Sequence, residues 1–149
     1  MKSLFTLEGS NEIVERINKL SAATPSQWGK MNVTQMLAHC QQPLHVAFGE
    51  LRIKRGLIGI LFSGYLKKKF SGDEPFKKNL PTARNFIVAN PGEFEMEKLK
   101  LISLVKRFSS AGPTSLSKNL HPFFGKLTAD EWDRLSWKHL DHHLQQFGA

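Results

Sequence analysis

The chain has 149 residues, of which 40% are hydrophobic, and this length and composition predict one soluble domain covering residues 1–149. No apolar run approaches the roughly 20 residues that a transmembrane helix needs, and the first residues, MKSLFTLEGSNE, lack the pattern of a secretory signal. The single cysteine, Cys40, excludes an internal disulfide, so we expect a cytoplasmic protein in a reducing compartment.

The formal net charge of +8 is concentrated in one part of the chain. Residues 52–84 contain nine lysines and arginines and two acidic residues, so this segment has a net charge of +7 and the rest only +1. A basic character confined to one segment does not describe the whole protein as a nucleic-acid binder, and no nucleic-acid motif is present. We therefore expect no nucleic-acid partner.

Two amphipathic helices are predicted in the N-terminal third of the chain. The first is capped by Ser10 or Asn11. Its apolar stripe holds Ile13, Val14, Ile17 and Leu20. After a loop, the sequence NVTQ at residues 32–35 predicts a capping box for a second helix that reaches about residue 50. The core face of this helix holds Val33, Met36, Leu37, Cys40, Leu44, Ala47 and Leu51.

His39 lies at the edge of this core face, and Pro43 follows it by four residues. The proline cannot donate to the His39 carbonyl, and its ring crowds that carbonyl, so a kink is expected beside His39. The kink either wraps the helix around the core or helps to aim the imidazole at a ligand. Cys40 is expected to be a buried structural thiol, and His45 lies on the opposite, solvated side.

The connection over residues 51–89 has the least regular pattern. Residues 57–66, LIGILFSGYL, form an apolar run that is interrupted by two glycines and followed by three lysines. This run is too short to span a bilayer. We expect a short helix or lid packed over one end of the molecule, and a basic helix that binds a membrane surface or a partner is the alternative.

Two further helices are predicted in the C-terminal part. The sequence NPGE at residues 90–93 is typical of a helix start, with Asn90 as the cap. The third helix has Phe94, Leu101, Ile102, Val105 and Phe108 on one face and ends before residue 111. A capping box from Thr128 to Glu131 starts the last helix. Four amphipathic helices without an alternating strand pattern predict an all-α four-helix bundle with a long irregular, partly helical connection between helices 2 and 3.

The last helix carries His139 and His143 one turn apart along the edge of its apolar face. Side chains at i and i+4 stand one above the other, so their ring nitrogens can converge on one ion. His39 is the preferred third ligand because it borders the core face of another helix, whereas His45 and His121 are weaker candidates. Three neutral imidazoles leave one position of a divalent ion open for water or substrate, which is typical of a reactive site.

Five other residues receive plainer interpretations. His142 is expected to be exposed, and His121 to anchor a loop. Gln146 and Gln35 are candidates for contacts that orient a ligand or a substrate. Trp28 is expected to cover one end of the bundle.

Three stretches of the chain resemble the DinB-like family of small bacterial proteins. They are QMLAHC at residues 35–40, HPFFGKLT at residues 121–128 and KHLDHHLQQF at residues 138–147. The resemblance covers most of the chain in outline. It implies a four-helix bundle that binds a metal, often nickel or zinc, through His39, His139 and His143. Characterised members of that family include thiol-dependent transferases and an isomerase that use low-molecular-weight thiols such as mycothiol or bacillithiol, and many others have no known activity.

These patterns leave three hypotheses open. The first is a metal-dependent thiol S-transferase or hydrolase, in which the ion lowers the pKa of a bound thiol or water. The second is a non-catalytic module that uses residues 52–84 to bind a polyanion or a protein partner. The third is a structural bundle whose three histidines are merely satisfied at the margin of the core. The metal, the small-molecule substrate and the oligomeric state, including a homodimer, are not determined by the sequence.

Overall fold

The computed structural model describes residues 2–72 and 74–149, and all regular structure within them is helical, apart from an isolated bridge between His121 and Gly125. The predicted all-α class is therefore confirmed. The helices are α1 (Leu7–Asn18), α2 (Val33–Ala47), α3 (Leu57–Leu61), α4 (Ser63–Phe70), η1 (Arg84–Phe86), α5 (Phe94–Ala111), η2 (Pro113–Ser115) and α6 (Ala129–Gln146). None of these helices has the length and apolar character that crossing a membrane requires.

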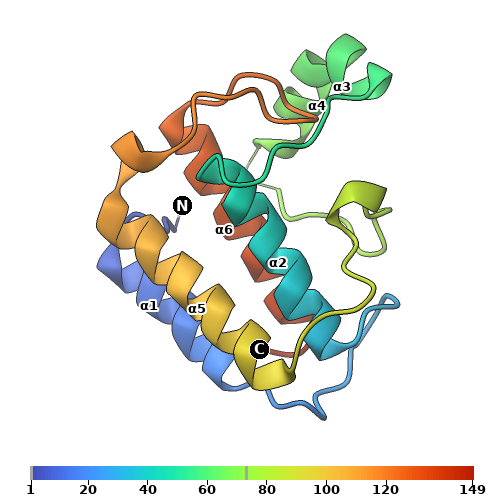
Figure 1. Ribbon diagram of the computed structural model, residues 1–149, viewed down its shortest axis with the longest axis vertical. Coiled ribbons are helices and arrows are strands. Elements are labelled where there is room, and N and C mark those ends of the chain that lie inside the picture. The colour runs from blue at the N-terminus through green and yellow to red at the C-terminus, as the bar shows by residue number, and fades with distance from the viewer. Residues whose placement is uncertain (1, 73) are drawn as a thin grey trace.

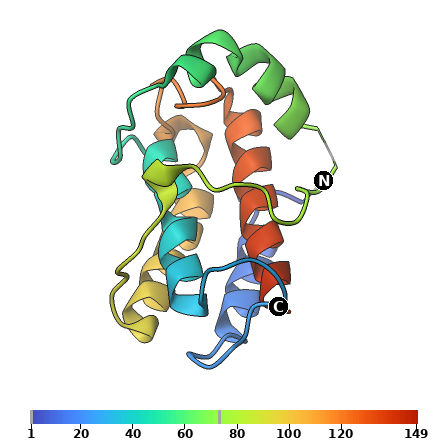
Figure 2. The ribbon, with the colours of Figure 1, turned by 90° about the vertical axis from the view of Figure 1, so that its right-hand side faces the viewer.

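The four longer helices α1, α2, α5 and α6 run alongside one another (Figures 1 and 2). Helices α1 and α2 each pack against both α5 and α6. Residues 48–93 connect α2 to α5 and include α3, α4 and η1. Figure 2 shows α3 and α4 at one end of the longer helices, where the sequence predicted a short helix. The pairing of α2 with α6 is the feature that matters for the site.

The core is built from the apolar faces that the sequence pattern predicted. Its fully buried side chains include Ile13, Ile17, Met36, Leu37, Leu44, Leu101, Val105, Phe108, Leu140 and Leu144. Helix α2 contains Pro43 within its span. Because the apolar stripes of α2 and α6 face this common core, residues at the edges of the two stripes are brought next to each other.

Helices α2 and α6 begin at the two predicted capping boxes. Asn32 Oδ1 accepts from the Gln35 amide at 2.8 Å, and Gln35 Oε1 accepts from the Asn32 amide at 3.1 Å. Thr128 Oγ1 accepts from the Glu131 amide at 3.2 Å, and Glu131 Oε2 accepts from the Thr128 amide at 2.8 Å. These reciprocal bonds satisfy amides that have no partner within the helix. They define where the two helices carrying the histidines start.

Two predicted caps are wrong. Helix α1 starts at Leu7, and its cap is Thr6, whose Oγ1 accepts from the Gly9 amide at 3.1 Å, rather than Ser10 or Asn11. Helix α5 starts at Phe94 with Glu93 at the cap position, so the expected cap by Asn90 does not form. The Gly92 amide donates to Glu97 Oε1 at 3.2 Å.

Candidate metal centre

Three histidines from two helices meet between α2 and α6. The Nε2 atom of His39 lies 3.0 Å from Nε2 of His139 and 3.1 Å from Nε2 of His143. His39 and His143 are buried, and His139 is half-buried. One ring nitrogen of each residue lies within 4.8 Å of the other two, so the cluster could hold a metal ion. The structure thus brings together the three residues that the sequence singled out.

A backbone carbonyl sets the proton position on His39. Its Nδ1 lies 2.9 Å from the carbonyl oxygen of Phe86, in η1. A carbonyl oxygen only accepts hydrogen bonds, so Nδ1 of His39 carries the proton. The Nε2 atom of the neutral ring then presents a lone pair to the centre of the cluster.

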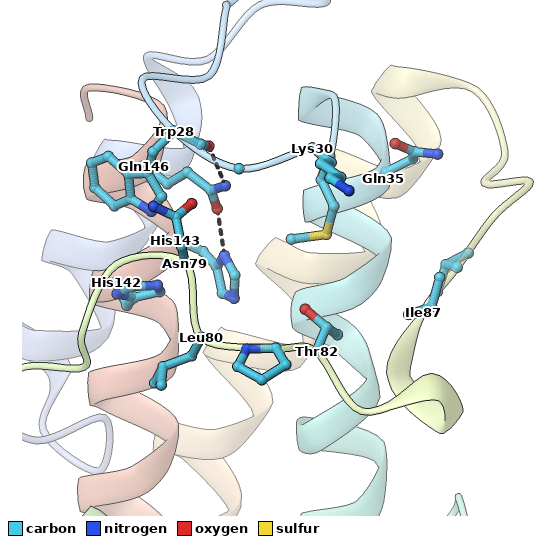
Figure 3. Close-up of a pocket in the computed structure, with 14 residues that line it drawn as sticks. Trp28, Lys30, Gln35, Asn79, Leu80, Thr82, Ile87, His142, His143 and Gln146 are labelled. Carbon is cyan, nitrogen blue, oxygen red and sulfur yellow. Dashed lines mark hydrogen bonds between the residues drawn. The ribbon is translucent and has the colours of Figure 1, made fainter.

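Gln146 sets the proton position on His143 in the same way (Figure 3). The Nε2 atom of Gln146 donates to the Trp28 carbonyl at 2.6 Å, which determines the orientation of the amide. The Oε1 atom of Gln146 therefore faces Nδ1 of His143, at 2.8 Å, and accepts its proton. His143 consequently also presents a lone pair from Nε2.

Two unprotonated Nε2 atoms therefore lie in contact, an arrangement that a positive charge between them would stabilise. In the neutral tautomers assigned above, Nε2 of His39 and Nε2 of His143 are both acceptors at 3.1 Å, and two acceptors at that distance repel. A divalent ion resolves the conflict, because metal–nitrogen bonds of about 2.0–2.1 Å at a tetrahedral angle separate ligand nitrogens by about 3.3 Å. The donors and their spacing therefore fit a metal ion.

Burial keeps the three rings uncharged. Desolvation lowers the pKa of His39 and, with the neighbouring histidines adding to the effect, lowers the pKa of His139 well below its ordinary value. Desolvation and the proximity of His39 lower the pKa of His143 to about 3. Imidazole binds metals in its neutral form, so the site is ready for an ion at neutral pH without first losing protons.

A cavity of about 570 Å³ reaches the cluster at His143 (Figure 3). One wall is formed by His142, His143 and Gln146 of α6, and the others by residues 28–31, 79–82 and 87–88 together with Gln35. Apolar side chains such as Met31, Leu80 and Ile87 line it beside a few polar ones. A small organic molecule can therefore reach the edge of the histidine cluster.

Two further residues lie near the cluster, and the expectation for one of them, His142, was wrong. Gln35 lines the cavity, where a contact with a substrate stays a prediction, and its amide takes part in the capping box and donates to the Ala89 carbonyl at 3.3 Å. His142 is half-buried rather than exposed. Its ring lies 5.8 Å from that of Trp28 and 6.0 Å from that of Phe76, because loops distant in sequence fold over this side of α6.

The remaining histidines and the cysteine lie outside the cluster. His45 is half-buried, and its Nδ1 lies 2.8 Å from Glu50 Oε2. His121 is buried, and its Nδ1 accepts from the amides of Phe123 and Phe124, so it anchors the loop as expected. Burial raises the pKa of the Cys40 thiol, as befits a structural cysteine.

Sequence reasoning missed the two carbonyls that set the tautomers. The Phe86 and Trp28 carbonyls belong to irregular segments, and no side-chain pattern marks a backbone oxygen as a partner of a histidine or a glutamine. For Gln146, the spacing of three residues from His143 on one helix was the available signal.

Comparison with known proteins yields one match. A family model described as "Protein of unknown function (DUF1569)" matches residues 2–149. No curated protein and no solved structure matches the chain. The matched range includes all six α-helices, the histidine cluster and the cavity beside it.

Proposed function

The chain belongs to the DUF1569 family, whose function is unknown, and we propose that it is a metal-binding protein that holds a divalent ion through His39, His139 and His143. The observation that carries the proposal is the 3.1 Å contact between two Nε2 atoms that hydrogen bonds to Phe86 and Gln146 leave without protons. A cation between the rings turns this repulsive contact into a favourable one.

We further propose that the fold is a four-helix bundle of the DinB-like type. The packing of α1 and α2 against both α5 and α6 supports this assignment. The long connection between α2 and α5 also supports it, because it carries α3, α4 and η1 and so is the partly helical connection expected from the sequence. The resemblance to that family implied the same three ligands that the helix geometry selected.

We propose a metal-dependent transferase or hydrolase activity for this site. Imidazole ligands suit zinc and nickel, and three neutral ligands leave the charge of the ion uncompensated, which favours an anionic fourth ligand. When bound, such an ion lowers the pKa of a coordinated thiol or water. The protein contributes oriented rings, held by Phe86 and Gln146, and a cavity that admits a small substrate, with a low-molecular-weight thiol as the proposed co-substrate.

Metal content tests the binding proposal. The chain is purified without an affinity tag, and bound metals are measured by mass spectrometry in the wild type and in the variants His39→Ala, His139→Ala and His143→Ala. His45→Ala serves as the control because His45 contacts Glu50 outside the cluster. We expect near-stoichiometric metal in the wild type and the control, and a strong loss in the other three.

Equal metal content in all five proteins would remove the proposal. A folded wild type that takes up no zinc, nickel or cobalt on reconstitution would instead support a purely structural bundle. The thiol is tested separately by loading the protein with Co²⁺ and adding a low-molecular-weight thiol. A sulfur-to-cobalt charge-transfer band is expected. Its absence would reject the thiol as co-substrate without contradicting the proposal that the protein binds a metal.

A further inference from the structure

Helices α3 and α4 lie at one end of the molecule (Figures 1 and 2), and several of their apolar side chains are exposed to solvent. Leu57 and Leu61 are 76% and 71% exposed, and Tyr65 is 64% exposed. We call these three residues, together with the exposed Ile60 and Phe62, the α3–α4 face. Single exposed apolar residues are ordinary, but five within nine residues of chain mark an interaction surface.

Contacts on the opposite side hold these helices to the body of the protein. A Cβ atom on the buried Gly59 would lie 2.0 Å from the Pro122 carbonyl oxygen, so α3 approaches this loop closely. Lys67 Nζ lies 2.8 Å from Glu131 Oε1, and Lys138 Nζ donates to the Phe70 carbonyl at 2.9 Å. The α3–α4 face therefore stays exposed when the segment is docked.

The charges within the segment that carries the α3–α4 face have one sign. Residues 52–69 contain six lysines and arginines and no aspartate or glutamate. Lys68 follows the apolar residues on α4 and is exposed. An outward apolar surface next to a run of cations is typical of segments that lie in the interface of an anionic bilayer.

We propose that the α3–α4 face docks onto the surface of an anionic phospholipid membrane. The apolar side chains enter the boundary between headgroups and acyl chains, and the exposed Lys68 and Lys69 contact the anionic headgroups. A second copy of the chain is disfavoured as the occupant because it would bring two basic surfaces together. A nucleic acid would match the charge but would leave the aliphatic side chains of Leu57, Ile60 and Leu61 without a partner.

Vesicle flotation with the purified full-length chain tests this proposal. We expect binding to vesicles of phosphatidylcholine mixed with phosphatidylserine, little binding to phosphatidylcholine alone, and weaker binding as salt is raised. Leu61→Asp should weaken binding by at least about tenfold because a leucine that inserts into the bilayer interface is replaced by a charge. Lys68→Glu should weaken it by about fivefold or more.

The chain offers matched controls. Leu7, on α1, is 72% exposed, so Leu7→Asp makes the same change at a similar exposure, and Lys106→Glu reverses an exposed charge on α5. Both controls should bind vesicles as the wild type does. Thermal unfolding verifies each fold, and Leu57→Asp replaces Leu61→Asp if the latter does not fold. His139→Ala should still bind vesicles, which separates this proposal from the metal site.

Four results would overturn the proposal. The first is no binding to phosphatidylserine vesicles at low salt. The second is equal binding by Leu61→Asp and Leu7→Asp. The third is a dimer in solution that Leu61→Asp dissociates while vesicle binding is absent, since the occupant would then be a second copy. Retention of DNA that depends on Lys68 but not on Leu61, without vesicle binding, would equally reject a lipid surface.

Discussion

Replacing Gln146 by leucine removes the side chain that sets the tautomer of His143. In the native protein Gln146 is 3% exposed, accepts from His143 Nδ1 at 2.8 Å and donates to the Trp28 carbonyl at 2.6 Å. Leucine has a similar size but can neither accept nor donate a hydrogen bond. The His143 ring can then place its proton on Nε2, which no longer binds a metal.

The expected loss can be worked out for two quantities. Losing the partner that orients a ligand histidine typically costs 10–100-fold in metal affinity, or about 1.4–2.7 kcal/mol. Separately, the free energy of unfolding of the metal-free protein should fall by about 1–3 kcal/mol, because His143 Nδ1 and the Trp28 carbonyl lose their partners. For a chain of this length, each kcal/mol lowers the Tm by about 2–4 °C.

Two assays separate these effects. Zinc affinity is measured by competition with a chromophoric chelator, and stability by urea denaturation of the metal-free protein. Gln145→Leu is the control, since Gln145 is exposed and donates to Asp141 Oδ2 rather than to the cluster. Gln146→Glu restores an acceptor for His143 but cannot donate to Trp28, so it should keep zinc affinity and lose stability. Equal zinc affinities for Gln146→Leu and Gln145→Leu would refute the tautomer argument.

Three further predictions concern the rest of the fold. Burial lowers the pKa of His121 to about 3 in the folded protein, so below about pH 6.5 only the unfolded state binds the proton. The free energy of unfolding therefore decreases as the pH is lowered below about 6.5. His121→Asn keeps an acceptor for the loop amides but does not titrate. In urea denaturation, its free energy of unfolding should therefore fall by about 2 kcal/mol less between pH 7 and pH 5 than that of the wild type. Equal losses in the two proteins would contradict the low pKa of His121. Gly59→Ala should destabilise the protein by about 1–3 kcal/mol because its Cβ meets the Pro122 carbonyl, whereas Gly64→Ala, with open space around it, should not; equal Tm values for the two would disprove the close approach. Thr128→Ala removes the cap of α6 and should cost about 1 kcal/mol in chemical denaturation, and a cost near zero would show that the capping box contributes little.

Much of the site could be predicted from local patterns. The spacing of His139 and His143 places both rings on one side of a helix whatever the rest of the chain does. The capping boxes at Asn32 and Thr128 depend on bonds within four residues, and both form. The position of His39 at the edge of an apolar stripe also follows from helical periodicity.

Local patterns failed where distant segments compete for the same groups. Asn90 does not cap α5, which starts at Phe94, and the Glu97 carboxylate that accepts from the Gly92 amide also accepts from Gln41 of α2. His142 looked exposed on an isolated helix, but Trp28 and Phe76 lie against it from segments more than sixty residues away. Burial of a helix face depends on what covers it, and helical periodicity alone does not give that information.

The sequence by itself determined the helical class, the two capped helices that carry the histidines and the choice of His39, His139 and His143, because these follow from spacings within single helices. Only the tertiary structure decided that the three rings approach to 3.0 and 3.1 Å, and that the carbonyls of Phe86 and Trp28 set the proton positions on His39 and, through Gln146, on His143. The reason is physical. How the helices pack decides the distance between atoms a hundred residues apart in the chain. Where the loops cross the helices decides which backbone oxygen accepts a hydrogen bond, because every residue has such an oxygen.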